Sequence, residues 1–261
     1  MPTHTLERSL MQNPLLWSCG VVVGALFLVM FFRLMPAYEI HFSSWFFTQS
    51  ECGGDSSKVR CGRFFSAVDK NLIMLRVIGL RLPQLFASAV AVWLVWLAFF
   101  KADKTSLDLM KPTHGLLSMI LGPALLTNVI FKPFWGRPRP VQTVEFGGEA
   151  PYVLAGDISE HCVGNCSFVS GEATAAFWMV WIIPFLPSKW RWLGGVLIVA
   201  LACGISLLRV VFGGHFLSDV MLGGMVALFA ITLSALIIQS PGVMAQIDRW
   251  RDFSNRHSFV R

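Results

Sequence analysis

The chain of 261 residues is 55% hydrophobic and only 14% charged, with a formal net charge of +6. Soluble domains usually carry about 25% charged residues, so the composition excludes an ordinary soluble protein and indicates one that lies in a membrane. Six spans of about 20 residues and their loops use up the length, which predicts a single membrane domain over residues 1–261. The positive charge is not gathered in a basic arm or face. Anionic lipid, and not nucleic acid, is therefore the expected partner.

Six apolar runs predict an all-α fold, a polytopic bundle of six transmembrane helices. They lie near residues 15–35, 79–100, 115–131, 168–187, 193–212 and 216–239. The first run is too long for a signal peptide and lacks a small-residue cleavage site, so we expect an anchored helix. The stretch at residues 61–82 is both basic and apolar, and we expect it along the membrane interface before the second span.

Six spans place both termini on one side of the membrane and the loops at residues 36–70 and 132–167 on the other. Lysines and arginines in the segments on the side of the termini predict that this side is cytoplasmic. The outer face carries as many basic residues, so the charge rule alone decides little. Four of the outer cations require another explanation: Lys132, Arg137, Arg139 and Arg209.

Two cysteines fall in each of the two long loops that share the predicted outer face. Cys52 and Cys61 lie in the first loop, and Cys162 and Cys166 lie in the second. Paired cysteines of this kind predict two disulfides in an oxidising compartment. A zinc site is the competing interpretation, although neither loop offers a clear set of four ligands.

The segment "KPFWGRPRP" begins at Lys132, directly after the third apolar run. Its prolines restrict the backbone, so its cations are partly fixed in place. The fork of an arginine such as Arg139 suits bidentate contact with phosphate, whereas a lysine supplies a point charge. The segment therefore predicts a phosphate site, and an anchor for lipid headgroups is the alternative.

The segment "RVVFGGHFLSD" joins the fifth and sixth runs and starts at Arg209. An arginine in a membrane span is costly and indicates function. His215 and Asp219 are four residues apart and share a face once the sixth helix has begun. An aspartate can hold one imidazole nitrogen and leave the other free to attack or to accept a proton. A purely structural pair is the alternative.

The segment "CSFVSGEAT" leads into the fourth run. Ser170 and Gly171 stand where free backbone N–H groups at a helix start form an anion site. Ser170 also fits a simple N-cap, and the two roles are compatible. Glu172 follows within the first turn, where a carboxylate is unexpected beside a membrane.

Together the three segments resemble the type 2 phosphatidic acid phosphatase (PAP2) superfamily. The matching residues are Lys132, Arg139, Ser170, Gly171, Arg209, His215 and Asp219, with the family's spacing in the first and third segments. They span residues 132–219, and all three segments fall on the same predicted face of the membrane.

The resemblance implies a role for each matching residue. Three cations would bind the phosphate oxygens, assisted by Ser170 and the Gly171 amide; they are Lys132, Arg139 and Arg209. His215 would be the nucleophile that forms a phosphohistidine, and Asp219 would orient it. The family needs no metal and no cofactor, so none is expected.

Three residues depart from the pattern of the family. Val169 replaces a usual proline, Leu208 replaces a frequent serine, and Glu172 stands where a second histidine protonates the leaving group. To act as that acid, Glu172 would need a proton at neutral pH, which nearby cations oppose and a bound phosphate dianion favours. Alternatively, the leaving group needs no acid, or Glu172 recognises an amine or hydroxyl on the substrate.

The "CSFVSGE" variant is similar to proteins grouped with the lipid A 4′-phosphatases. This resemblance implies a lipid phosphatase at the periplasmic face of a bacterial inner membrane, with a lipid A-type phosphate as the favoured substrate. Undecaprenyl diphosphate and phosphatidylglycerophosphate stay open as substrates. A transporter or a scaffold that binds lipid phosphate without hydrolysis is the alternative function, and the oligomeric state is left open.

Overall fold

The computed structural model describes residues 13–51, 61–64, 66 and 68–256. Within this part of the chain, five helices are long and apolar enough to cross a membrane, and a further apolar helix, Gly171–Phe185, is shorter. The five are Pro14–Leu34, Lys70–Phe99, Ser106–Phe134, Ser188–Val211 and Leu217–Ile238. The protein is therefore a helical, multi-pass membrane protein, and a sixth full-length span stays a prediction.

Four of the long helices are single elements, and the other two apolar helices are composite. The single ones are α2 (Pro14–Leu34), α4 (Lys70–Phe99), α8 (Ser188–Val211) and α9 (Leu217–Ile238). The composite ones join α5 (Ser106–Met119), the π-helical η2 (Ile120–Phe131) and α6 (Lys132–Phe134), and α7 (Gly171–Trp178) with the 3-10 helix η5 (Met179–Phe185). The remaining elements are α3 (Pro36–Ser44), β1 (Phe47–Ser50), β2 (Cys61–Phe64), η3 (Pro140–Gln142), η4 (Val144–Phe146) and α10 (Pro241–Arg256).

Helix α9 lies at the centre of the bundle and packs against α2, α5, η2 and α7. Two glycines on α9 allow α7 to approach closely. A Cβ atom at Gly223 would lie 2.8 Å from the Ser170 carbonyl oxygen, and one at Gly224 would lie 3.2 Å from the Phe177 ring. The start of α7 is therefore fixed directly against the start of α9.

Helix α4 begins earlier than the sequence predicts. The Asp69 carboxylate accepts hydrogen bonds from the backbone N–H groups of Asn71 (2.8 Å) and Leu72 (3.1 Å), which caps a helix at that point. The helix then continues through Pro83 to Phe99. The predicted interfacial stretch is therefore divided between β2 and the first turns of α4, and it is not a separate segment.

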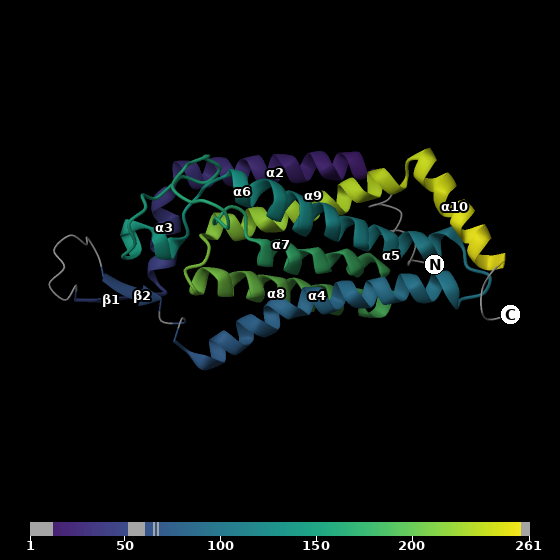
Figure 1. Cartoon of the computed structure of the whole chain (residues 1–261), viewed down its shortest axis with the longest axis horizontal. Helices are drawn as coiled ribbons and strands as arrows, with labels where there is room; N and C mark the ends of the chain where they lie inside the picture. The colour runs from purple at the N-terminus through teal and green to yellow at the C-terminus, as the bar shows by residue number, and fades with distance from the viewer. Residues whose placement is uncertain (1–12, 52–60, 65, 67, 257–261) are drawn as a thin grey trace.

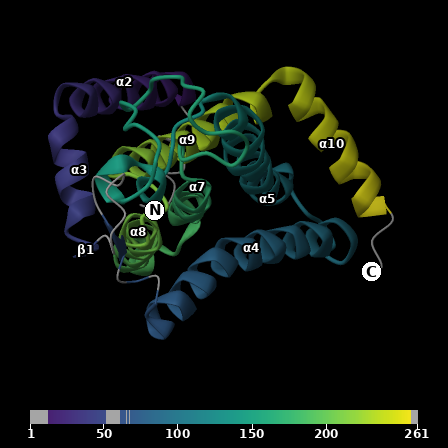
Figure 2. The same cartoon turned by 60° about the vertical axis from the view of Figure 1, so that its left-hand side comes forward.

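Helix α3, the two strands and the loop between α6 and α7 gather at one end of the bundle, and α10 lies at the other (Figures 1 and 2). Strands β1 and β2 are antiparallel, with Phe47 opposite Phe64. Phe64 packs with Phe146 and Phe216 in a buried cluster and contacts the turn at Gly213, where a Cβ atom would collide with its ring. The hairpin is thus fastened to the turn that leads into α9.

The loop before α7 contains one disulfide, between Cys162 and Cys166. This confirms the prediction for that pair, and it excludes the zinc interpretation there because both thiolates are consumed. Cys52 lies outside the described residues, so its bond to Cys61 stays a prediction.

Candidate active site

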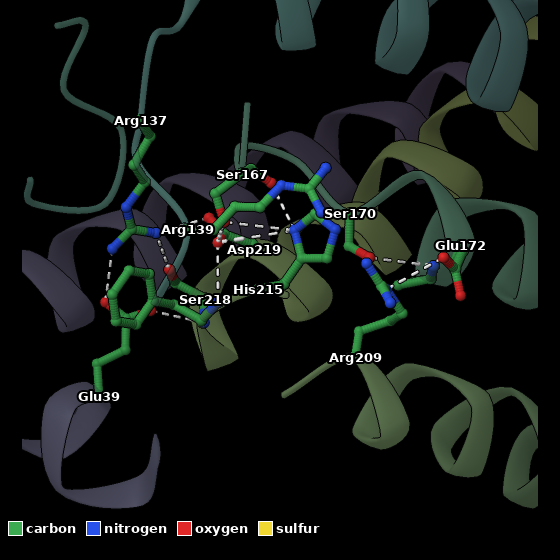
Figure 3. Close-up of polar contacts among 12 residues, drawn as sticks. Glu39, Arg137, Arg139, Ser167, Ser170, Glu172, Arg209, His215, Ser218 and Asp219 are labelled. Carbon is green, nitrogen blue, oxygen red and sulfur yellow. Dashed lines mark hydrogen bonds and ion pairs between the residues drawn. The ribbon is translucent and has the colours of Figure 1, made fainter. Parts of the chain in front are cut away.

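The three segments singled out in the sequence meet at the end of the bundle that carries α3 and the hairpin (Figure 3). The first supplies Arg139, the second Ser170 and Glu172, and the third Arg209 and His215. A Cβ atom at Gly214 would lie 2.7 Å from a terminal nitrogen of Arg209. Gly214, directly before the histidine, therefore makes room for a guanidinium group.

His215 is 2% exposed, and its Nδ1 atom lies 2.7 Å from the backbone oxygen of Ser167. A carbonyl oxygen only accepts hydrogen bonds, so Nδ1 carries the proton and Nε2 keeps a free lone pair. Burial, followed by the positive charges of Arg209, Arg139 and Lys132, holds the pKa of His215 well below its usual value. The imidazole is therefore neutral at pH 7 and has the tautomer of a nucleophile.

Asp219 supports His215 in a different way from the one expected. Its Oδ2 atom is 4.0 Å from His215 Nδ1, and no direct hydrogen bond joins the two. Instead Oδ2 accepts hydrogen bonds from the Ser167 hydroxyl (2.5 Å) and from the Phe216 N–H (2.9 Å). Asp219 therefore caps α9 and fixes Ser167, whose carbonyl oxygen in turn holds the imidazole.

Arg137 is fully buried and connects the site to the rest of the protein. Its Nη1 atom donates to Asp219 Oδ1 (2.6 Å) and to the Ser218 hydroxyl (2.7 Å). Nη2 donates to Glu39 Oε2 (2.8 Å), and Nε donates to the Val153 carbonyl (3.0 Å). Burial alone would lower the pKa of this guanidinium, but the Asp219 and Glu39 carboxylates raise it above its usual value. Arg137 thus stabilises the Asp219 carboxylate and is not free to bind phosphate.

Glu39, on α3, completes this buried network. Its Oε1 atom accepts from the Ser218 N–H (2.8 Å), and Oε2 accepts from Arg137 and from the Tyr152 hydroxyl (2.6 Å). Burial and the Glu39 carboxylate both raise the pKa of Tyr152. Sequence reasoning missed Glu39. The available signal was a lone carboxylate in the apolar stretch "MPAYEIHF".

The N-terminus of α7 begins at Gly171 and is capped by Ser170, the N-cap that the sequence predicts. The Ser170 hydroxyl caps the helix by accepting from the Ala173 N–H at 3.4 Å. A Cβ atom at Gly171 would lie 3.3 Å from Lys132 Nζ. Glycine here lets the Lys132 ammonium lie close to the helix start, and a positive charge beside free N–H groups favours an anion there.

Arg139 depends on the loop that the disulfide closes. Its Nε and Nη2 atoms donate to the Asn165 carbonyl at 3.3 and 3.0 Å, and Asn165 lies between Cys162 and Cys166. Burial, then the neighbouring Arg76, lowers the pKa of Arg139. The disulfide therefore restrains the residue that orients one of the three predicted phosphate ligands.

The Glu172 side chain is 16% exposed and faces two guanidinium groups, of which Figure 3 shows that of Arg209. Its Oε1 atom is 3.2 Å from Arg209 Nε and 3.7 Å from a terminal nitrogen of Arg76. The contact with Arg209 is an ion pair without hydrogen-bond geometry. Sequence reasoning did not include Arg76 in the site, because it lies on α4, far from the three segments in the chain.

Comparison with known proteins decides the family. Residues 112–241 match the family model described as "PAP2 superfamily". The chain belongs to the PAP2 superfamily. The relatives include proteins named "Lipid A 4′-phosphatase" from Rhizobium etli, Rhizobium leguminosarum and Francisella tularensis subsp. novicida. The first is 38% identical over 212 residues, which cover 79% of this chain and 80% of the relative.

The other two relatives are 35% and 31% identical, over 79% and 78% of this chain and 88% and 87% of their own lengths. No solved structure matches. As a PAP2 protein with several membrane helices, the chain is a membrane lipid phosphatase, a hydrolase of phosphoric monoesters.

Proposed function

We propose that this phosphatase removes a phosphate from a lipid A-type substrate at the periplasmic face of a bacterial inner membrane, through a phosphohistidine and without a metal. The observation that carries the proposal is the state of His215. Its Nδ1 proton is held by the Ser167 carbonyl, so Nε2 is free among three cations that favour a phosphate. The substrate class follows the names of the three relatives.

In the first step, the phosphate binds between Lys132, Arg139 and Arg209, with the α7 N-terminus below it. His215 Nε2 attacks phosphorus, a P–N bond forms, and the bond from phosphorus to the sugar oxygen breaks. The leaving oxygen takes a proton from Glu172. Positioning and charge stabilisation account for most catalysis of phosphoryl transfer, and the preorganised cations supply both.

The imidazole becomes positively charged when the P–N bond forms. Its Nδ1–H group keeps the hydrogen bond to the Ser167 carbonyl, and the Asp219 carboxylate, 4.0 Å away, stabilises the new charge. In the second step, water attacks phosphorus, the P–N bond breaks, and phosphate leaves with both protons of the water. His215 and Glu172 then return to their starting states.

Glu172 can serve as the acid only if it gains a proton after the substrate has bound. In the empty site, Arg209 and Arg76 favour its carboxylate form. A phosphate dianion at Arg209 takes away one of these partners and adds negative charge next to Glu172, and both effects favour protonation. Substrate binding itself thus prepares the acid.

The proposed orientation places α10 in the cytoplasm. Its helix carries Arg249, Arg251 and Arg256, and Lys101 and Lys104 precede α5 at the same end of the bundle. Basic residues of this kind favour the cytoplasmic side. The site at the opposite end then faces the periplasm, where the Cys162–Cys166 disulfide is stable.

Release of phosphate from defined lipids by the purified full-length protein tests the proposal. A lipid A-type phosphate should be hydrolysed faster than phosphatidylglycerophosphate or undecaprenyl diphosphate, and chelators should have no effect. Rapid acid-free quenching with labelled substrate should trap a phosphohistidine that His215→Ala cannot form. A folded His215→Ala protein that keeps more than a few per cent of wild-type turnover would exclude the nucleophile, and binding of lipid phosphate with no hydrolysis would indicate a transporter or scaffold.

A further inference from the structure

Arg76 lies outside the three segments that carry the chemistry, yet it reaches the same site. It stands on α4, which packs against both α7 and α8. Its guanidinium is 3.7 Å from Glu172 Oε1 and lies over the Phe212 ring, 5.4 Å from the centroid. The ring and the carboxylate together fix the direction of a long side chain that is otherwise 40% exposed.

The charge of Arg76 is unfavourable to its cationic neighbours. It lowers the pKa of Arg139, and it adds a fourth cation to a site that already has three. An ion pair as exposed as the one with Glu172 contributes little to stability. Stability therefore does not explain why a guanidinium is directed at this carboxylate.

Arg209 cannot hold Glu172 throughout the reaction. It is the nearer partner in the empty site, at 3.2 Å, but it is also a proposed ligand of the substrate phosphate. Once phosphate occupies Arg209, the dianion repels the carboxylate. Among the described residues, Arg76 is the remaining cation that forms an ion pair with Glu172.

We propose that Arg76 is the positioning residue for Glu172 and keeps its carboxyl group beside the leaving oxygen while phosphate occupies Arg209. The inference rests on the proposed acid role of Glu172. The Arg76 guanidinium lies 3.7 Å from Oε1, and its positive charge attracts this oxygen in both the ionised and the protonated carboxyl group. Oε2 then carries the proton that passes to the leaving oxygen as its bond to phosphorus breaks.

The test compares a primary alkyl phosphate, whose leaving group needs a proton, with nitrophenyl phosphate, whose leaving group does not. The full-length Arg76→Gln protein should lose about 10- to 100-fold in kcat on the alkyl phosphate, the cost of a misplaced catalytic group, and less than threefold on the aryl phosphate. Arg76→Lys should recover part of the loss. The matched control is Arg81→Gln, which removes an exposed arginine on the same helix that contacts Gln84.

A double-mutant cycle gives the decisive result. In the Glu172→Gln background, Arg76→Gln should cause little further loss, because the group that it positions is already disabled. Equal losses on both substrates, or losses that multiply in the double variant, would overturn the inference and show that Arg76 binds phosphate directly or supports the fold. If the wild-type protein hydrolysed neither substrate nor any lipid phosphate, the proposed function itself would fail. An active wild-type protein whose Arg76→Gln variant was equally active would instead refute only the inference about Arg76.

Discussion

Replacing Glu172 with glutamine separates its catalytic role from its effect on binding. Glutamine keeps the size of the side chain and can still accept a hydrogen bond, but it cannot donate a proton as an acid. General-acid catalysis contributes about 10² to 10⁴ in rate. We therefore expect kcat on the lipid substrate to fall by that factor, and kcat on nitrophenyl phosphate to change little.

The same substitution should strengthen binding of inorganic phosphate. In the empty site Glu172 occupies Arg209, with 3.2 Å between Oε1 and Nε, so an incoming anion must displace it. At an effective dielectric constant of about 20, two unit charges about 5 Å apart repel each other by about 3 kcal/mol. Solvent near the carboxylate reduces this repulsion. If half of the energy remains, the affinity for phosphate should rise about tenfold in Glu172→Gln.

Steady-state kinetics on both substrates, with inorganic phosphate as a competitive inhibitor, measures all three quantities. A role in recognising the lipid predicts another pattern, a raised KM for the lipid alone with kcat unchanged. An equal fall in kcat on both substrates, with no change in KM or in phosphate inhibition, would refute the acid role and the recognition role alike.

Three further predictions concern the surroundings of the nucleophile. Because burial and three cations lower the pKa of His215, its imidazole should stay neutral at pH 6.5 and become protonated only well below that value. A histidine NMR signal that titrates near 6.5 and disappears in His215→Gln would contradict this. Arg137→Gln should lower the free energy of unfolding by about 3–5 kcal/mol because it leaves two buried carboxylates without the cation that they share. The same change at the half-exposed Arg33 should cost no more than about 1 kcal/mol, and similar melting temperatures of the two variants in detergent would argue against the network. Peptide mapping without reduction should recover the Cys162–Cys166 bond, and free thiols at both positions in protein from intact cells would count against the bond. Replacing both cysteines with serine should lower the free energy of unfolding by about 2 kcal/mol, as expected for so short a loop, and should raise KM.

The sequence was sufficient to predict the groups that the structure brings together at the proposed phosphate site. Their spacing along the chain resembles that of the PAP2 superfamily, and the segments that carry them lie at the same end of the helix bundle. Hydropathy also located most of the long helices, because apolar length is what a span requires. It placed the start of α4 about two and a half turns too late, since the Asp69 cap lies in a stretch that is both basic and apolar.

The supporting contacts could not be predicted from the sequence. Arg137 was noticed as an unexplained cation, but its partner Glu39 is 98 residues away, and no local pattern links them. The Nδ1 partner of His215 is a backbone carbonyl, that of Ser167, which residue type does not reveal. Long-range pairing of charges depends on how helices pack, and a single sequence contains little information about that.

Restoring the family's histidine at position 172 provides a last test, because the structure predicts that it will fail. An imidazole there would stand beside Arg209 and Arg76, whose guanidinium groups lie 3.2 and 3.7 Å from the present carboxylate oxygen. Positive neighbours disfavour the protonated form of a histidine, so Glu172→His would lack the proton to donate, and its kcat on an alkyl phosphate should stay close to that of Glu172→Gln. Adding Arg76→Gln removes one of the two cations and should raise kcat again, although the same change lowers kcat in the wild-type protein. This reversal of sign would show that Glu172 and Arg76 act as a matched pair, and wild-type turnover in Glu172→His alone would show that they do not.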